Sequence, residues 1–285
     1  MALYSIGTLL VEIDTLSHNL LPFLLPEKLH GSNIDLTIIH TSKPHNTRCL
    51  LKAANFAHLT IWKDMSDPQC IRWVFDANDG LCTFSVNADY TEAEYYYSRV
   101  FECLTKDDFR DFLSPYLQLL LECKLIQNDF LILHSAAVKT DNRAFAFTGP
   151  SGIGKSTRAK KWIDLFSGEW ISGDRPAIDV NKVHVYGVPW DGKEAIYKNI
   201  HCPLSAIFSV RRSEYTEIRE MLEEVKLQTL CEQAFFPLWD VALAAKTMYS
   251  IKRLINWVPI FELNCDITDE SICKANEMIE IAKLL

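Results

Sequence analysis

The segment from Gly149 to Ser156 constrains this chain more strongly than any other. Its residues are Gly-Pro-Ser-Gly-Ile-Gly-Lys-Ser, a complete match to the phosphate-binding pattern G-x-x-x-x-G-K-[ST]. The short apolar run from Ala144 to Phe147 predicts a buried strand before it, and the apolar spacing from Lys155 to Phe166 predicts a helix after it. Strand, glycine-rich loop and helix therefore follow in the order that a phosphate-binding loop requires.

The residue types in this loop have defined chemical uses. Glycines let the backbone curl until successive N–H groups point into one concavity, where they add to the positive end of the following helix. Lys155 would reach the β- and γ-phosphates, and the Ser156 hydroxyl would ligate a Mg²⁺ ion that bridges them. A glycine-rich turn that only joins strand to helix is the alternative, but it needs neither this lysine nor this hydroxyl. ATP and Mg²⁺ are therefore the expected ligands, and the expected binding residues are Gly149, Ser151, Gly152, Ile153, Gly154, Lys155, Ser156 and Thr157.

Composition limits the partners. The chain has 285 residues, enough for two domains or one elaborated domain. Its net charge of −8 does not provide the basic surface expected for binding nucleic acid or anionic lipid. The nine cysteines are scattered without a C-x-x-C pair, and the chain has neither a signal-peptide pattern nor an uninterrupted apolar stretch of about 18 residues. We expect a cytoplasmic protein without nucleic-acid or membrane partners; a homo-oligomer is compatible with the sequence.

The pattern changes along the chain. Residues 1–105 contain short β-like runs separated by turn residues, without metal-ligand or nucleophile spacing, which predicts a β-rich N-terminal module. Within it, the cluster from Tyr95 to Tyr97 is expected on a packed helix face. Residues 106–285 form the predicted nucleotide-binding domain, which opens with an amphipathic helix to about residue 128.

Several segments around the loop carry polar residues. Phe130 to Val138 is predicted as one buried strand that contains His134, and Trp170 to Pro176 as a short strand that ends in Asp174. An aspartate at a strand end beside a phosphate loop can hold Mg²⁺ or position a nucleophile. On the helix after the loop, the basic residues Arg158, Lys160 and Lys161 are expected to face solvent.

Four segments taken together resemble the HPr kinase/phosphorylase family: His134 to Val138, Gly149 to Thr157, Ile171 to Ile178 and Tyr186 to Glu194. The chain is more closely similar to the HPr-kinase-related proteins found beside peptide-modification genes, including kinases of lasso peptides. The resemblance covers about residues 130 to 285. It implies a mixed α/β fold shared with phosphoenolpyruvate carboxykinases, with the phosphate loop on a twisted sheet, and it implies kinase chemistry.

The resemblance also implies roles for individual residues. His134 matches a family histidine that lies near an acidic residue, and Asp174 matches that acidic residue. A carboxylate that accepts the proton of a hydroxyl needs a tuned pKa, which a neighbouring imidazole can supply. Lys193, in the segment Trp190-Asp191-Gly192-Lys193-Glu194, is the candidate for holding the transferred phosphoryl group or an acidic substrate. The predicted catalytic residues are therefore Asp174, His134, Lys155 and Lys193, and the predicted metal ligands are Ser156 and Asp174.

The chain departs from the family at Gly173, where a pair of consecutive aspartates is usual. Either Asp174 alone both accepts the hydroxyl proton and ligates Mg²⁺, or Asp179 or Glu194 supplies the second carboxylate oxygen. A weaker kinase is a further alternative. The leading expectation is an ATP- and Mg²⁺-dependent kinase that phosphorylates a Ser or Thr hydroxyl of a small protein or precursor peptide. The alternatives are a kinase of a small hydroxyl metabolite and a nucleotide-binding regulator with weak or no transfer.

Overall fold

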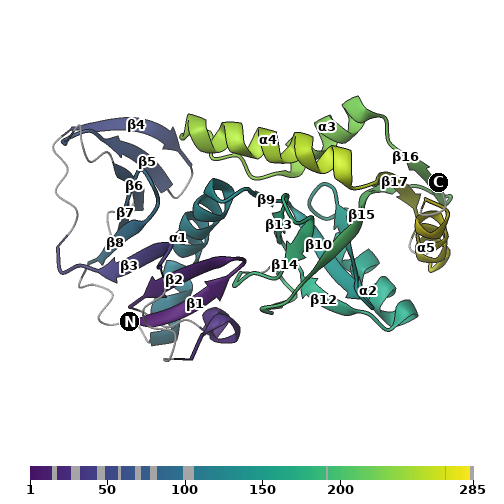
Figure 1. Cartoon of the computed structure of the whole chain (residues 1–285), viewed down its shortest axis with the longest axis horizontal. Coiled ribbons are helices and arrows are strands. Elements are labelled where there is room, and N and C mark those ends of the chain that lie inside the picture. The colour runs from purple at the N-terminus through teal and green to yellow at the C-terminus, as the bar shows by residue number, and fades with distance from the viewer. Residues whose placement is uncertain are drawn as a thin grey trace. The chain divides into compact units, whose positions relative to one another are not determined.

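The chain forms two compact units, which are described separately below (Figure 1). The computed structural model describes residues 1–14, 18–26, 33–43, 49–56, 59–67, 72–77, 82–98, 106–190, 192–266 and 268–282. The first unit comprises Met1–Leu125 and Pro237–Ala244, and the second comprises Ile126–Phe236 and Ala245–Leu285. The units divide the chain at Leu125, whereas the sequence-based boundary was placed after residue 105.

The first unit is built on an eight-stranded sheet of order β1-β2-β3-β8-β7-β6-β5-β4 in the described residues. The strands β2, β3 and β8 pair in parallel, and the other neighbours are antiparallel. The elements are β1 (Ala2–Ile6), β2 (Leu9–Ile13), η1 (His18–Phe23), β3 (Leu36–His40), β4 (Leu50–Asn55), β5 (Leu59–Asp64), β6 (Arg72–Ala77), β7 (Cys82–Asn87), β8 (Glu92–Tyr97) and α1 (Lys106–Gln127).

The tyrosine cluster was predicted wrongly. Tyr95 to Tyr97 lie on β8, which pairs with β3 and β7, and not on a helix. Tyr95 is buried and stacks on Phe84 of β7 with ring centroids 5.5 Å apart. Aromatic side chains favour strands because they pack against cross-strand neighbours on the pleated surface, and this preference decides the outcome here.

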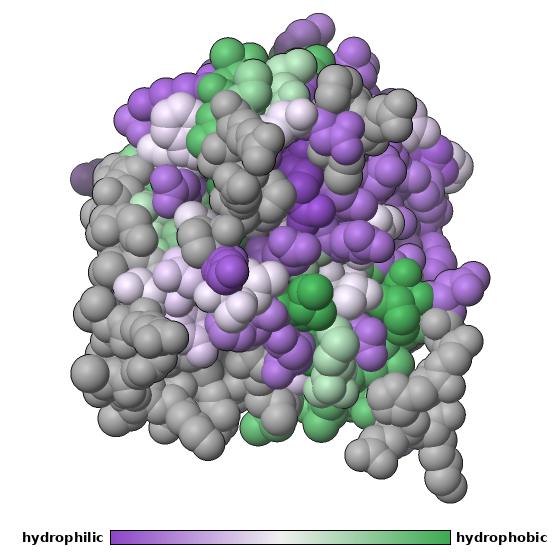
Figure 2. Space-filling model, turned by 90° about the vertical axis from the view of Figure 1, so that its left-hand side faces the viewer, coloured by the Kyte–Doolittle hydropathy of each residue, from purple (hydrophilic) through white to green (hydrophobic). Residues whose placement is uncertain are grey.

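Figure 2 views the molecule from the side of β4 to β8, and the surface coloured there mixes hydrophilic and hydrophobic residues. Strand β4 lies at the edge of its sheet, and its Leu51 is 60% exposed.

None of the described helices is both long enough and apolar enough to cross a lipid bilayer.

The second unit is built on a mixed sheet of nine strands in the described residues, ordered β12-β10-β11-β15-β14-β13-β9, with β17 beside β15 and β16 beside β17. Strand β11 is parallel to β15, and β15 is parallel to β17. The elements are β9 (Phe130–Ile132), β10 (Ser135–Thr140), β11 (Arg143–Thr148), α2 (Lys155–Phe166), β12 (Glu169–Ser172), β13 (Ala177–Asp179), β14 (His184–Tyr186), β15 (His201–Arg212), β16 (Glu217–Glu220), α3 (Glu223–Gln233), α4 (Val241–Trp257), β17 (Ile260–Cys265) and α5 (Glu270–Ala282). The predicted mixed α/β class is confirmed.

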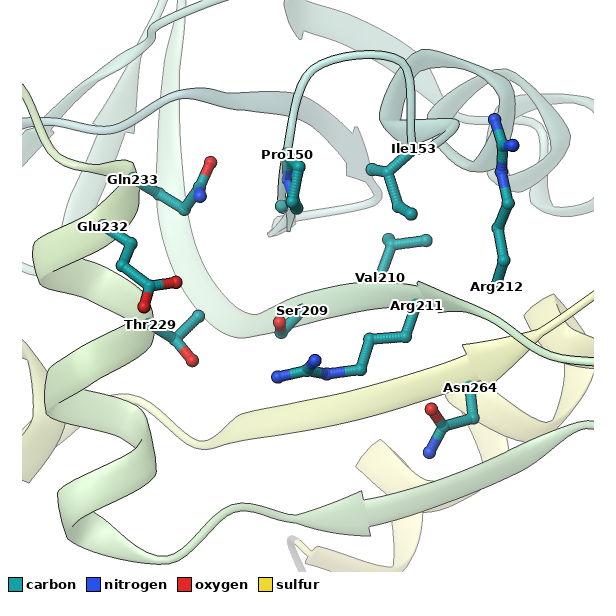
Figure 3. A pocket seen from close by; sticks show the side chains of 11 residues that line it. Pro150, Ile153, Ser209, Val210, Arg211, Arg212, Thr229, Glu232, Gln233 and Asn264 are labelled. Atoms are coloured by element: carbon teal, nitrogen blue, oxygen red, sulfur yellow. The ribbon is translucent and has the colours of Figure 1, made fainter.

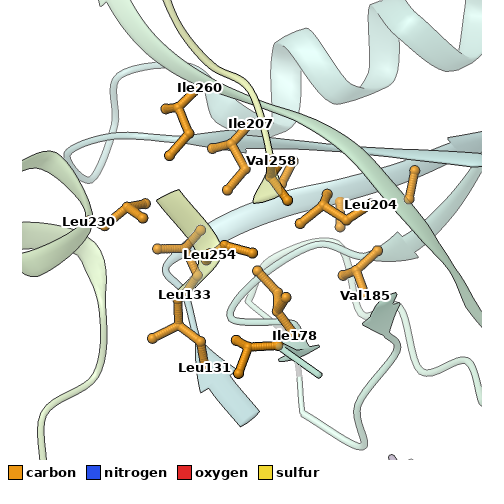
Figure 4. Close-up of a cluster of buried hydrophobic side chains, with 14 of the residues drawn as sticks. Leu131, Leu133, Ile178, Val185, Leu204, Ile207, Leu230, Leu254, Val258 and Ile260 are labelled. Atoms are coloured by element: carbon orange, nitrogen blue, oxygen red, sulfur yellow. The ribbon is translucent and has the colours of Figure 1, made fainter. Parts of the chain in front are cut away.

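Alternation along the strands gives this sheet two buried faces. Ala144 and Ala146 of β11 point into one apolar cluster, whereas Phe145 and Phe147 point into the other. The first cluster, shown in Figure 4, includes Leu230 of α3 together with residues of α4 such as Leu254. The second includes residues of α2 and α5. Because side chains of a strand alternate between faces, one short apolar run holds helices on both sides of the sheet.

Helix α2 is held firmly against this sheet. Trp162 is fully buried, lies 4.3 Å from the ring of Phe145 between centroids, and donates from Nε1 to Thr140 Oγ1 at 2.9 Å. An indole that fills the interface and also satisfies its polar atom fixes the helix without an unpaired donor. The N-terminus of α2, which follows the phosphate loop, therefore has a fixed position relative to β11.

The predicted strand from Phe130 to Val138 is interrupted. Strand β9 pairs with β13, whereas β10 pairs with β11 and β12, so the chain moves from one part of the sheet to another at Leu133 and His134. There the backbone is held by the end of α3, because the N–H of His134 donates to the Gln233 carbonyl at 2.9 Å. The interruption frees the His134 side chain from the core.

Candidate active site

The glycine-rich loop from Gly149 to Gly154, called the phosphate loop below for the role that the sequence predicts, connects β11 to α2. Gly149 has φ 140° and Gly154 has φ 110°, conformations that residues with a side chain rarely adopt. A Cβ atom on Gly149 would lie 3.1 Å from the carbonyl oxygen of Val210, so the loop passes close to β15 at this point. These two glycines therefore set the start and the end of the curl.

Lys155 lies over the loop. Its Nζ donates to the carbonyl oxygens of Gly149 and Pro150 at 3.1 and 3.3 Å, and the residue is buried. Burial lowers the pKa of Lys155, while the negative charges of Asp174 and Glu194 act in the opposite direction. The ammonium group is thus partly desolvated and already positioned at the loop.

One cavity of about 410 Å³ brings most of the predicted site residues together. It is lined by four separate segments: the loop with the start of α2, the residue before β10, the turn after β12, and the segment after Trp190. The lining residues are His134, Ser151, Gly152, Gly154, Lys155, Ser156, Thr157, Gly173, Asp174, Gly192, Lys193 and Glu194. All four predicted catalytic residues and both predicted metal ligands are among them.

Asp174 and His134 form a pair at this cavity. Asp174 Oδ1 lies 3.7 Å from His134 Nε2, and each side chain is about one-third exposed. The Oδ1 atom is itself buried and has no hydrogen-bond partner among the described residues. A buried carboxylate oxygen without a donor is costly to a fold unless a proton, a cation or a ligand satisfies it.

His134 is held in its neutral form. Burial lowers its pKa, and the cation of Lys155 lowers it further, against the raising effects of Asp174 and of a side-chain hydrogen bond with Gln233. At neutral pH the imidazole therefore faces Asp174 as an uncharged group.

A strained turn orients Asp174. Arg175 has φ 52°, in the left-handed region, and its carbonyl oxygen accepts a hydrogen bond of 3.0 Å from Trp190 Nε1. The Ser172 hydroxyl donates to the Asp174 carbonyl at 2.9 Å. A non-glycine residue in this conformation costs on the order of 1 kcal/mol and persists only where its surroundings hold it. The buried Trp190 thus supports the turn. Further along the same segment, Lys193 and Glu194 line the cavity, and Asp191 lies outside the described residues.

Two predicted phosphate-loop residues, Gly149 and Ile153, line a different cavity of about 420 Å³ on the other side of the loop (Figure 3). In this cavity β15 supplies Ser209 to Arg212, and α3 supplies Thr229, Glu232 and Gln233. Arg212 extends toward the loop, where its Nη2 donates to the Gly152 carbonyl at 2.6 Å. This bond holds the tip of the loop through the Gly152 carbonyl and engages no N–H group of the loop.

The structure contradicts the expectation for Arg158 and one of the two alternatives for the second carboxylate, Asp179. Arg158 is buried and not solvent-facing; its Nε donates to Cys265 Sγ at 3.1 Å and its Nη2 to the Asp266 carbonyl, which ties α2 to the end of β17. Asp179 does not line the cavity with Asp174, because its Oδ1 accepts the N–H groups of Asn181 and Lys182 in the hairpin turn at 2.9 and 3.0 Å. Of the two candidates for a second carboxylate, only Glu194 lies at the cavity.

The sequence pattern did not indicate Gln233 or Phe235 as site residues. Gln233 and Phe235 adjoin the Asp174–His134 pair in a further cavity of about 390 Å³, lined by His134, Asp174, Arg175, Glu232, Gln233, Ala234, Phe235 and Phe236. The guanidinium of Arg175 lies over the Phe235 ring, 4.9 Å from its centroid. Only the fold brings the end of α3 to His134, so no local signal could identify these residues.

The donor set fits a Mg²⁺ ion that arrives with phosphates. Mg²⁺ is usually bound by one or two protein oxygens together with phosphate oxygens and water. Ser156 and Asp174 supply a hydroxyl and a carboxylate at one cavity, and the Asp174 carboxylate is not saturated, because its Oδ1 has no hydrogen-bond partner among the described residues. Among the described residues, no group of three or more His, Cys, Asp and Glu side chains is arranged to hold a metal.

No protein-family model matches the chain, and no curated protein sequence matches it significantly. The chemistry open to the site follows from its own residues. These are a glycine-rich loop with a buried lysine, a carboxylate paired with a neutral imidazole, and a second lysine and carboxylate on the facing segment.

Proposed function

We propose that this protein is an ATP- and Mg²⁺-dependent kinase, related to HPr kinase/phosphorylase, that transfers the γ-phosphoryl group to a hydroxyl. The expected acceptor is a Ser or Thr side chain of a small protein or precursor peptide. One observation carries the proposal: a single cavity joins the phosphate loop with its lysine to a buried carboxylate oxygen that has no hydrogen-bond partner among the described residues. Phosphoryl transfer needs these two elements side by side, since the first binds the donor and the second receives the proton of the acceptor.

The donor end consists of the loop and two lysines. The loop N–H groups and Lys155 bind the β- and γ-phosphates, and Lys193 faces the same cavity from the opposite segment. When bound to Ser156 and Asp174, Mg²⁺ supplies charge neutralisation at the phosphate oxygens. Cations around the transferred group stabilise the negative charge that spreads over its oxygens in the transition state.

The acceptor end consists of Asp174 and His134. Asp174 accepts the hydroxyl proton while the acceptor oxygen bonds to the γ-phosphorus and the bond to the β-phosphate oxygen breaks, so ADP leaves. Neutral His134, with its Nε2 atom 3.7 Å from Asp174 Oδ1, orients the carboxylate and shares the proton that the carboxylate accepts. The 390 Å³ cavity, here called the acceptor cavity, shares both residues with the 410 Å³ cavity, here called the phosphate cavity. It therefore offers the acceptor a direct approach to the γ-phosphate. Its volume suits one side chain of a peptide or a small metabolite.

Arg175 gives a test of this acceptor cavity. In Arg175→Gly, the left-handed backbone is kept without strain while the guanidinium is removed, so we expect KM for the acceptor to rise about tenfold with KM for ATP unchanged. Steady-state kinetics with each substrate varied would measure this split. Arg175→Lys is the matched variant, which keeps the charge but loses the planar group over Phe235. A rise in KM for ATP alone would show that the cavity belongs to the nucleotide instead.

The state of His134 predicts a pH effect on stability. Its pKa lies below the ordinary 6.5 in the folded chain because of burial and Lys155. As the pH falls through 6.5, the unfolded chain takes up this proton first, so the folded state loses stability; above 6.5 neither state is protonated and the effect vanishes. The fall in the free energy of unfolding between about pH 7.5 and about pH 5.5 is thus expected to be smaller in His134→Asn than in wild type. Urea unfolding at both pH values measures it, and equal falls in the two proteins would contradict the assignment.

A direct assay tests the function. Purified protein is incubated with Mg²⁺ and ATP labelled at the γ-phosphate, with panels of Ser- and Thr-containing peptides and small hydroxyl compounds. Label on an acceptor, with ADP released in equal amount, is the expected result, and the acceptor that is labelled separates peptide from metabolite. Nucleotide binding without label or ADP release would reject the kinase.

That rejection would leave a second candidate, a nucleotide-binding regulator with weak or no transfer. Gly173 favours it, because this residue lines the phosphate cavity and contributes no carboxylate there. Glu194 is the carboxylate at the cavity besides Asp174, and its position on an exposed segment makes it a weaker metal ligand than a buried one.

A further inference from the structure

A fourth cavity adjoins the phosphate site on the side away from Asp174. It measures about 430 Å³ and is lined by Ser156, Thr157, Lys160, Lys161, Asp164, Trp170 and Glu194. Three of these residues, Ser156, Thr157 and Glu194, also line the phosphate cavity. The two spaces are therefore continuous along the first turns of α2.

The residues at the two ends of the phosphate cavity set the direction of a bound nucleotide. Asp174 and His134 lie at the end that adjoins the acceptor cavity, so the γ-phosphate belongs there. Ser156 and Thr157 lie at the end that adjoins the fourth cavity. In an in-line transfer, the attacking oxygen of the acceptor and the leaving oxygen of the β-phosphate lie on opposite sides of the γ-phosphorus. With the acceptor at the Asp174 end, the β-phosphate and the nucleoside must therefore extend past Thr157.

Trp170 makes a rigid wall of the fourth cavity. It lies on β12, where its backbone pairs with Val138, and it packs against the apolar cluster that contains Phe145 and Trp162. The residue is only half-buried, which leaves part of the indole at the cavity. Two basic residues of the same cavity form ion pairs: Lys160 with Asp164 at 3.0 Å, and Lys161 with Asp269. A lining that combines an aromatic side chain with polar groups suits a planar base.

We propose that this cavity holds the nucleoside of the bound nucleotide, with its base stacked on Trp170. The proposal rests on the proposed function, because it takes the phosphate cavity as the site of the phosphates. Stacking of a base on an aromatic side chain stabilises binding independently of the phosphates and tolerates any base, since every base has a π-face. Trp170 then determines affinity for the nucleoside, and the loop determines affinity for the phosphates.

The opposite orientation is the main competitor. The acceptor cavity also contains an aromatic ring, Phe235, with Arg175 over it, and such a pair can hold a base. If the base lay there, however, the Asp174–His134 pair would sit beside the nucleoside and not at the transferred phosphate. The two orientations predict that different aromatic residues control nucleoside affinity.

The experiment compares a diphosphate that carries the nucleoside with one that lacks it. Calorimetric titration with Mg²⁺ measures the affinity of wild type, Trp170→Leu and Phe235→Leu for ADP and for pyrophosphate. Wild type is expected to bind ADP more tightly than pyrophosphate. Trp170→Leu is expected to lose about tenfold in ADP affinity with pyrophosphate affinity unchanged, and Phe235→Leu to keep both affinities.

Each other outcome overturns a specific part of the proposal: the base contact, the orientation of the nucleotide or the phosphate site. Equal affinity of wild type for ADP and pyrophosphate, which needs no variant, shows that the base makes no contact and rejects the proposal. Loss of ADP affinity in Phe235→Leu and not in Trp170→Leu reverses the orientation. Failure of wild type to bind either ligand rejects the phosphate site itself, and with it the proposed function. Unchanged pyrophosphate binding in Trp170→Leu also shows that this variant is folded.

Discussion

Replacing Asp174 with asparagine is expected to lower phosphoryl transfer by about 10²–10⁴-fold while nucleotide binding is kept. Asparagine has the same shape but cannot accept the acceptor's proton. The carboxylate raises the pKa of Lys155 by its charge, so its removal takes a negative group away from the bound phosphates, and the amide oxygen of asparagine still offers Mg²⁺ a ligand. We therefore expect nucleotide binding to be kept. Single-turnover transfer rates and calorimetric Kd values for ADP measure the two effects separately.

Asp179→Asn is the matched control for this variant. Asp179 is a buried aspartate of the same unit, but it accepts backbone N–H groups in a hairpin turn and lies outside the phosphate cavity. Its replacement is expected to cost about 1 kcal/mol of stability or less and to leave the transfer rate unchanged. Equal rates in Asp174→Asn and Asp179→Asn would remove Asp174 from the chemistry.

Replacing Lys155 with methionine is expected to lower the transfer rate by about 10²–10³-fold and to abolish stabilisation by nucleotide. Methionine fills a similar volume without the charge. Because burial lowers the pKa of Lys155, removing the cation relieves a desolvation cost, but it also removes the donor of the Gly149 and Pro150 carbonyls. The two effects oppose each other, so the unliganded variant should be about as stable as wild type.

Thermal unfolding with and without ligand checks this prediction. A ligand at about 100 times its Kd stabilises the folded state by about 2.7 kcal/mol, so Mg²⁺ and ADP should raise the Tm of wild type and not that of Lys155→Met. Lys274→Met is the control, since Lys274 lies on α5 and pairs with Glu270 at 2.6 Å, away from the phosphate cavity. A nucleotide-induced rise in Tm that persists in Lys155→Met would show that nucleotide binds elsewhere.

Local patterns predicted some elements correctly. The strand–loop–helix unit around Gly149 depends on turn residues and periodicity within about 25 residues, and the structure has it. The predictions that were wrong depended on partners distant in the sequence. Nothing in Phe130 to Val138 indicates that its two halves pair with different strands, and the charge of Arg158 does not show that Cys265 and the Asp266 carbonyl lie beside it.

The sequence by itself determined the glycine-rich loop, because eight consecutive residues supply the glycines, the lysine and the hydroxyl within one strand–loop–helix unit. Only the tertiary structure decided what faces that loop. It interrupts the strand at His134 and holds Asp174 on a strained turn, with Asp174 Oδ1 3.7 Å from His134 Nε2. It also keeps Asp179 out of the cavity that contains this pair, and it brings Phe235 and Trp170 to adjoining cavities. The physical reason is distance along the chain: a backbone curl is a local property, whereas a carboxylate and an imidazole separated by forty residues meet only when the sheet between them has formed.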